Sequence, residues 1–268
     1  DLLVPTMPAM KRHFAACDPV MAALMRAAGP YRLEPQAARS PFESLARAIT
    51  HQQLNGTAAN RILERFIGLC GNGAFPTPAA VLARPDGELR AVGLSFAKIA
   101  SLKDLAAKAG DGLVPDSATL IALDDGAIVE RLTQVRGIGR WTVEMLLMFQ
   151  LGRPDVLPVD DFGVRNGFRL AYGLAGMPTP RALAAFGERW APQRTAAAWY
   201  LWRAVELARE GRLPAPAGRP RGIRIVKPKK KVRKAVARPA RRKSAAAAGP
   251  RRAPSTRAAR ARRGRSKR

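Results

Sequence analysis

The last fifty residues of this chain cannot build a folded core. From Arg219 to Arg268 the sequence holds 22 Lys or Arg residues and no Asp or Glu. Like charges repel along such a segment, and its few apolar residues bury too little surface to offset the loss of chain entropy. We therefore predict a folded body over residues 1–212, and over residues 213–268 a disordered DNA-binding tail rich in Lys, Arg, Ala and Pro.

The charge of the whole chain points to a polyanionic partner. The 268 residues carry 47 Lys or Arg against 20 Asp or Glu, a formal net charge of +27. The part before Arg219 retains 25 basic and all 20 acidic residues, so the body is close to an ordinary folded protein. Lys and Arg gain free energy on phosphates through released counterions, which favours DNA as the partner.

Several classes of protein are disfavoured by composition. Two cysteines, Cys17 and Cys70, are too few for a disulfide framework, a four-cysteine zinc site or an iron–sulfur cluster. The two histidines, His13 and His51, have no metal-ligand spacing. No apolar run of about 18 residues is present, and no export signal is visible. We expect a protein without a membrane span that resides with the DNA, in the bacterial cytoplasm or a eukaryotic nucleus.

The body has the apolar spacing of helices. Phe42, Leu45 and Ile49 recur at intervals of three and four, and no sustained alternation suggests a sheet. Ser40 followed by Pro41 is typical of a helix start, and Asn55 and Thr179 are expected to cap further helices. The predicted fold class is all-α.

One motif narrows the function. Residues 132–144 read LTQVRGIGRWTVE, with Gly137, Ile138 and Gly139 between apolar residues and a helix that starts near Arg140. The open N–H groups of such a turn and the positive end of the next helix bind phosphate, and Arg140 adds a formal charge. This is the helix-hairpin-helix pattern, predicted at about 132–150. The simpler interpretation is a glycine turn between two packed helices.

A pair of carboxylates follows the hairpin. Residues 157–165 read LPVDDFGVR, so Asp160 and Asp161 stand where a new helix begins. Most aspartates at such positions only cap the helix. The order of hairpin, loop and aspartate, however, resembles the signature of the helix-hairpin-helix DNA glycosylase superfamily.

The resemblance extends to the alkylbase branch of that superfamily, the 3-methyladenine DNA glycosylase II type. It rests on GIGRWT at 137–142, PVDDFGVR at 158–165, QQ at 52–53 and the two segments WAPQR and WYLWR at 190–194 and 199–203. The resemblance implies a two-lobed helical fold in a compact form without the N-terminal β domain. It also implies a monomer. The enzyme is expected to be monofunctional, because Trp141 stands where bifunctional members carry a Schiff-base lysine.

The resemblance assigns roles to particular residues. Asp161 is expected to be the catalytic carboxylate, which stabilises the oxocarbenium-like sugar, and Asp160 to cap the helix or bind the loop. The reverse assignment of the two is the alternative. Trp141 and Trp202 match positions in the base pocket, where aromatic rings attract cationic alkylated purines. Met145 stands where some relatives have a pocket tyrosine.

The turn at Gln53 and Leu54 is the predicted wedge that fills the space left by a flipped base, with Gln53 preferred. The resemblance implies no required cofactor, but a monovalent cation, Na⁺ or K⁺, at the backbone carbonyls of Thr133, Val135 and Ile138.

The predicted partner is double-stranded DNA with alkylated bases such as 3-methyladenine and 7-methylguanine. Two alternatives stay open at this point. One is a glycosylase for another lesion, either an oxidised base or a mispaired adenine, and the other is a DNA-binding protein without enzymatic activity.

Overall fold

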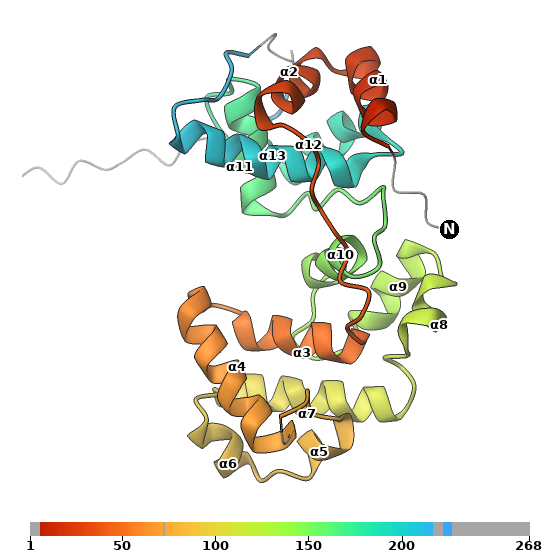
Figure 1. Ribbon diagram of the computed structural model, residues 1–268, viewed down its shortest axis with the longest axis vertical. Coiled ribbons are helices and arrows are strands. Elements are labelled where there is room, and N and C mark those ends of the chain that lie inside the picture. Colours follow the sequence, from red (N-terminus) through yellow and green to blue (C-terminus); the bar gives the residue numbers. More distant parts are fainter. Residues whose placement is uncertain (1–5, 72, 217–221, 227–268) are drawn as a thin grey trace, which may run out of the picture. The chain divides into compact units, whose positions relative to one another are not determined.

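A computed structural model describes residues 6–71, 73–216 and 222–226. In this part of the chain the structure is helical, with one isolated antiparallel bridge between Pro178 and Ile225. The predicted all-α class is confirmed (Figure 1). In chain order the helices are α1 (Met7–Cys17), α2 (Pro19–Ala28), α3 (Pro41–His51), α4 (Gly56–Gly71), α5 (Pro78–Leu82), α6 (Asp86–Ala91), α7 (Phe96–Gly110), α8 (Ser117–Ile121), α9 (Asp125–Leu132), α10 (Arg140–Phe149), α11 (Phe162–Ala171), α12 (Pro180–Gly187), the 3₁₀ helix η1 (Glu188–Trp190) and α13 (Arg194–Arg209).

The predicted helix starts are confirmed by their caps. Ser40 Oγ accepts the N–H of Glu43 at 3.1 Å, and Asn55 Oδ1 accepts the N–H of Ala58 at 2.9 Å. Thr179 Oγ1 accepts the N–H of Ala182 at 3.2 Å. Each bond satisfies an N–H group that the helix itself leaves without a partner, which is why a short local signal was sufficient.

Packing sorts the helices into two groups. In the first, α7 packs against α3, α5 and α6, and α10 packs against α3 and α9. In the second, α13 packs against α11 and α2, and α2 against α1. The approach of α11 to α13 is close because Gly167 has no side chain, and a Cβ there would overlap the carbonyl of Leu201. This contact brings the start of α11 near Trp202 of α13.

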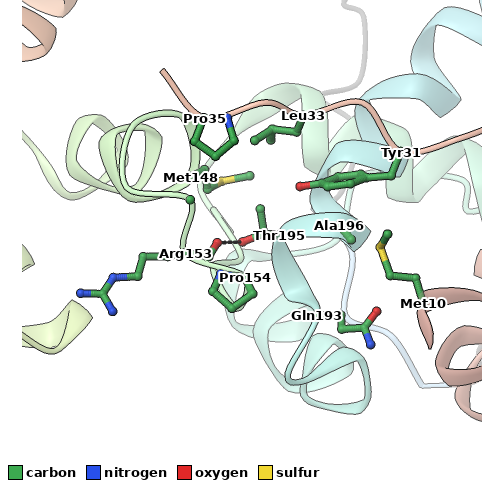
Figure 2. Close-up of a pocket in the computed structure, with 11 residues that line it drawn as sticks. Met10, Tyr31, Leu33, Pro35, Met148, Arg153, Pro154, Gln193, Thr195 and Ala196 are labelled. Atoms are coloured by element: carbon green, nitrogen blue, oxygen red, sulfur yellow. Dashed lines mark hydrogen bonds between the residues drawn. The ribbon is translucent and has the colours of Figure 1, made fainter. Parts of the chain in front are cut away.

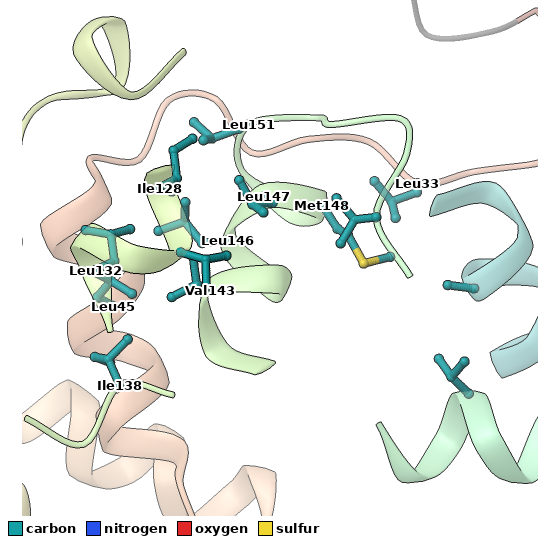
Figure 3. Close-up of a cluster of buried hydrophobic side chains, with 14 of the residues drawn as sticks. Leu33, Leu45, Ile128, Leu132, Ile138, Val143, Leu146, Leu147, Met148 and Leu151 are labelled. Carbon is teal, nitrogen blue, oxygen red and sulfur yellow. The ribbon is translucent and has the colours of Figure 1, made fainter. Parts of the chain in front are cut away.

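The hairpin is anchored in the core of the first group. Ile138 at the turn is buried, and so are Leu132 of α9 and Val143 and Leu147 of α10. Figure 3 shows these side chains gathered beside Leu45 of α3. Burial of side chains of this size contributes about 1.5–3 kcal/mol each, so the turn is held rigidly.

A buried carboxylate joins the second group. Asp18 is only 2% exposed, and its Oδ1 caps α2 through the N–H groups of Val20 and Met21. Its Oδ2 accepts the Tyr172 hydroxyl at 2.6 Å and the Trp190 indole N–H at 2.8 Å. Trp190 is therefore a core residue. Four donors on one buried carboxylate offset the cost of removing its charge from water.

The predicted tail begins later than residue 213. Leu213 packs against the core, and residues 222–226 lie along the loop before α12. The N–H of Thr179 donates to the Arg224 carbonyl at 2.9 Å, and the N–H of Val226 to the Met177 carbonyl at 2.8 Å. The sequence showed only the change in composition and not these backbone bonds. Most of the predicted tail, residues 217–221 and 227–268, lies outside the described residues.

Candidate active site

The hairpin presents an open helix end. Gly137 has φ of +77°, a left-handed conformation that favours glycine, and a Cβ there would lie 2.7 Å from Ser101 Oγ. Gly139 is the N-cap of α10 and supplies no side-chain cap. Arg140 follows it with 64% of its side chain exposed. The open N–H groups and the helix dipole suit a phosphate, and the exposed Arg140 guanidinium, which lies 3.7 Å from Glu144 Oε1, adds a formal positive charge nearby.

Hydrogen bonds from neighbouring helices hold the hairpin turn in place. Asp104 Oδ2 accepts the backbone N–H of Arg136 at 2.7 Å and the Lys108 ammonium at 2.8 Å. Burial alone would raise the pKa of Asp104, but these bonds outweigh it and hold the pKa below its ordinary value. Gln52 Nε2 donates to the Gly137 carbonyl at 2.8 Å and so links the α3–α4 turn to the hairpin.

The three carbonyls predicted for a monovalent cation belong to the same turn. Val135 O accepts the N–H of Ile138 at 3.0 Å, which leaves it a second lone pair. Carbonyl oxygens are suitable donors for Na⁺ or K⁺, so the donors of Thr133, Val135 and Ile138 fit the ion by type. The site stays a prediction.

Asp161 is the N-cap of α11, and three N–H groups converge on its carboxylate. Its Oδ1 accepts the backbone N–H of Val164 at 2.7 Å and the indole N–H of Trp202 at 2.8 Å. Its Oδ2 accepts the indole N–H of Trp141 at 2.9 Å. A carboxylate with this many donors is fixed in place as an acceptor.

The structure brings the predicted catalytic residue and the two predicted pocket tryptophans together. The ring faces of Trp141 and Trp202 were predicted to contact the base, but the bonds of their N–H groups to Asp161 were not predicted. Gly163 makes the contact possible, because a Cβ there would lie 2.7 Å from Trp202 Cδ1 and 2.9 Å from its Nε1.

The helix-capping role suggested for Asp160 is wrong. The helix begins at Phe162, so the N-cap position belongs to Asp161, whose side chain makes the capping bond to Val164. Asp160 is exposed, and its carboxylate has no hydrogen bond within the described residues. The two aspartates are adjacent, and only the exact start of the helix decides which one caps.

An aromatic face runs along α10 beside the carboxylate. Trp141, Met145 and Phe149 are spaced four apart and share one side of the helix. Trp141 is 45% exposed, and Phe149 stacks on Trp202 with ring centroids 5.8 Å apart. Met145 and Phe149 also line a cavity of about 230 Å³ against α3. Phe149 was not predicted as a site residue, although its spacing from Trp141 and Met145 would have revealed it.

A second aromatic residue was missed. Phe162 directly follows Asp161 and is 67% exposed. An apolar ring held in solvent beside a fixed carboxylate is available to contact a ligand. The sequence signal was its place in the aspartate motif.

The predicted wedge residues are both exposed. Gln53 has φ of +59°, which is uncommon for a residue other than glycine, and Leu54 is 41% exposed. The N–H of Leu54 donates to the His51 carbonyl at 3.3 Å and closes the turn. The wedge assignment stays a prediction, and the strained backbone at Gln53 is consistent with it.

A buried carboxylate lies on α10 three residues after Trp141. Glu144 is only 6% exposed, with Arg140 Nη1 at 3.7 Å. Burial raises the pKa of Glu144 to about 7, and Asp160 and Asp161 add to this effect while Arg140 opposes it. The burial of Glu144 was not predictable from the sequence, because a glutamate within a helix is usually exposed.

A separate small cavity contains none of the predicted site residues. Figure 2 shows Tyr31, Met148 and Gln193 around it, and the Thr195 hydroxyl donates to the Arg153 carbonyl at 2.6 Å. Gln193 Oε1 is buried without a hydrogen-bond partner in the described part. The lining is mostly apolar, and we assign it no role.

Two further observations concern membranes and metals. Within residues 6–71, 73–216 and 222–226, no helix has both the length and the apolar character to cross a bilayer. The same residues include no group of three or more His, Cys, Asp or Glu side chains placed to hold a metal ion.

Comparison with known proteins places 3-methyladenine DNA glycosylases among the relatives of this chain. The chain is 42% identical over 207 residues to DNA-3-methyladenine glycosylase 1 of Schizosaccharomyces pombe, covering 77% of this chain and 91% of that protein. The solved 3-methyladenine DNA glycosylase of that organism, in complex with abasic DNA, superposes with a TM-score of 0.68 over 74% of this chain and 97% of the other. A DNA-3-methyladenine glycosidase from Bacillus halodurans, 33% identical in sequence, superposes with a TM-score of 0.67 over 75% of this chain and 91% of the other.

The family pattern described as the HhH-GPD superfamily of base excision DNA repair proteins matches residues 46–193. This range contains the hairpin, both aspartates and the α3–α4 turn. The predicted resemblance, including its 3-methyladenine branch, is confirmed. The chain belongs to the HhH-GPD superfamily of base excision DNA repair proteins.

Proposed function

We propose that this protein is a monofunctional DNA glycosylase that excises alkylated purines, 3-methyladenine and 7-methylguanine, from double-stranded DNA as a monomer. The observation that carries the proposal is the Asp161 carboxylate, held by the N–H groups of Trp141, Trp202 and Val164 beside exposed aromatic rings. The names of the relatives, DNA-3-methyladenine glycosylases, support the substrate class.

The chemistry follows from the fixed charge. The base must leave the stack before its sugar can be reached. When the N-glycosidic bond breaks, the base keeps the electron pair and positive charge develops on the deoxyribose. Asp161 stabilises that charge, water oxygen adds to C1′, and the water proton passes to the carboxylate or to solvent.

The aromatic face of α10 supplies selectivity. An alkylated purine such as 3-methyladenine or 7-methylguanine is cationic, which makes it a good leaving group without a dedicated acid. Cation–π attraction contributes roughly 0.5–2 kcal/mol per ring and favours the cationic base over its neutral parent. Trp141, Phe149 and Trp202 are the rings placed for this contact.

The absence of strand cleavage is part of the proposal. α10 contains no lysine, and Trp141 stands in its first turn. Lys98 and Lys108 donate to the backbone carbonyls of Thr50 and Gln134 instead. Base removal should therefore leave an abasic site. The hairpin carbonyls of Thr133, Val135 and Ile138 are proposed to hold Na⁺ or K⁺ near a DNA phosphate.

The test is base release from methylated duplex DNA, resolved into 3-methyladenine and 7-methylguanine. The full chain should release both, Asp161→Asn should release neither while still binding DNA, and Asp160→Asn is the matched control that should retain activity. Activity in Asp161→Asn would refute the mechanism. Failure of the full chain on methylated, oxidised and mispaired substrates, with DNA binding retained, would favour the binding-protein alternative.

A further inference from the structure

An open hollow of about 650 Å³ lies between α12, η1 and the segment 222–226, outside the candidate active site. Three arginines, Arg181, Arg189 and Arg224, line it together with Phe186 and Thr179. The three arginines come from three different elements, so their convergence is a product of the tertiary fold.

The arginines of this hollow have no carboxylate partner in the described part of the chain. Glu188 is adjacent to Arg189 in sequence, but it pairs with Arg194 at 3.1 Å. The segment from Arg219 to Arg268 contains no Asp or Glu side chain, so the tail cannot neutralise the hollow either. Three guanidinium groups around one space repel each other, and an external anion would relieve that repulsion.

One guanidinium is held in position. Arg189 lies over the Phe186 ring at 3.7 Å, and its Nε donates to the Phe186 carbonyl at 3.1 Å. This fixes the base of the group and leaves its outer N–H donors for a ligand. Guanidinium N–H groups match the oxygens of a phosphate in geometry and charge.

The hollow also lies where the basic tail leaves the body. The segment that carries Arg224 is bonded to Met177 and Thr179, on either side of Pro178. Arg165, one turn after Asp161, donates to the Pro178 carbonyl at 3.0 and 2.9 Å. The same loop therefore connects residues 222–226 to α11, the helix that Asp161 caps.

We propose that this hollow binds backbone phosphates of DNA, as a second phosphate contact in addition to that of the hairpin. It holds the DNA strand at the point where the tail begins, so that tail and body engage one duplex. This goes beyond the proposed excision activity, since it requires only that the protein binds DNA.

The test compares two full-length variants that each lose three positive charges. The first variant, Arg181→Gln/Arg189→Gln/Arg224→Gln, removes the three guanidinium groups from the hollow. The second, Lys11→Gln/Arg12→Gln/Arg26→Gln, removes three exposed positive charges from α1 and α2. Affinity for a long undamaged duplex is measured against NaCl concentration. Each lost phosphate contact reduces the magnitude of the slope of log K against log [NaCl] by about 0.9. We therefore expect this slope to be smaller by about 1–3 in the first variant, and its affinity for DNA to be several-fold weaker.

The control variant should keep a slope near that of the parent. Equal slopes in the two variants would overturn the proposal, including the case in which the hollow binds an acidic protein instead. Arg181→Gln/Arg224→Gln, which keeps the Arg189 contact with Phe186, guards against a folding defect and should show part of the loss. Because the readout is binding to undamaged duplex, failure of this proposal is distinct from failure of the excision activity.

Discussion

The indole N–H of Trp202 donates to Asp161 Oδ1 at 2.8 Å, although the two residues are 41 positions apart in the sequence. Asp161 is the N-cap of α11 and Trp202 lies within α13, and the two helices approach closely because Gly167 has no side chain. The contact gives Trp202 a positioning role toward the carboxylate in addition to its ring face.

Trp202→Phe should slow base release by roughly 10- to 100-fold, because it keeps the ring and removes the N–H that orients Asp161. DNA affinity should change little, since the phosphate contacts are elsewhere. Single-turnover rates and binding measured separately check this split. Trp199→Phe, which alters a ring packed on Tyr31, is the control. If the Trp202→Phe variant released the base at the parental rate, Trp202 would have only a packing role.

Gly163→Ala should produce the same defect indirectly. The new Cβ would lie 2.7 Å from Trp202 Cδ1, so the indole must move away from Asp161. We expect slower release, and no further loss when the change is combined with Trp202→Phe, because both act on one contact. Gly68→Ala, where nothing lies within 4 Å, is the matched control. Additive losses would argue against a shared cause.

Gly137→Ala should destabilise the protein by about 1–3 kcal/mol and weaken DNA binding. The residue has φ of +77°, and a Cβ would press on Ser101 Oγ. Gly139→Ala should cost less in stability, since its φ is −101° and nothing lies within 4 Å. Urea unfolding of both variants tests the difference. Equal destabilisation would show that the left-handed conformation is unimportant.

Glu144→Gln should stabilise the protein increasingly as pH rises from about 4.5 to 7. Burial raises the pKa of Glu144 from 4.5 to about 7, so in this window the native state holds a proton that the unfolded state has lost. Parental stability therefore falls with rising pH, and the variant escapes this loss, worth on the order of 1–3 kcal/mol.

Losing the ion pair between Arg140 and Glu144 should reduce the stability of the variant only slightly, because the guanidinium is mostly exposed. Melting temperatures of parent and variant at pH 4, 5, 6, 7 and 8 give the comparison. A stability difference independent of pH would contradict the raised pKa.

Truncation after Val226 should lower DNA affinity and its salt dependence but leave the choice of base unchanged. It removes the 19 Lys and Arg residues from Lys227 onward and keeps the bonds of residues 222–226 to Met177 and Thr179. The slope of log K against log [NaCl] should fall by several units if those residues contact phosphates. An unchanged slope would remove the tail from the DNA interface.

Local interactions account for what could be predicted. The caps at Ser40, Asn55 and Thr179 and the glycine turn at Gly137 depend on residues a few positions apart, so their signals survive in the sequence. The position of Asp161 at a helix start is of the same kind. Local signals could not decide whether Asp160 or Asp161 is the cap, because the answer changes when the helix starts one residue earlier or later.

The sequence by itself determined an all-helical body, the hairpin with its open N–H groups, and the strongly basic composition of residues 219–268. Only the tertiary structure decided that Trp141 and Trp202 both bond to Asp161, that Glu144 is buried, and that Arg181, Arg189 and Arg224 meet around one hollow. The physical reason is range. Helix formation and capping are local, whereas these contacts depend on how α10, α11, α12 and α13 pack, and packing is set by the shapes of many side chains at once.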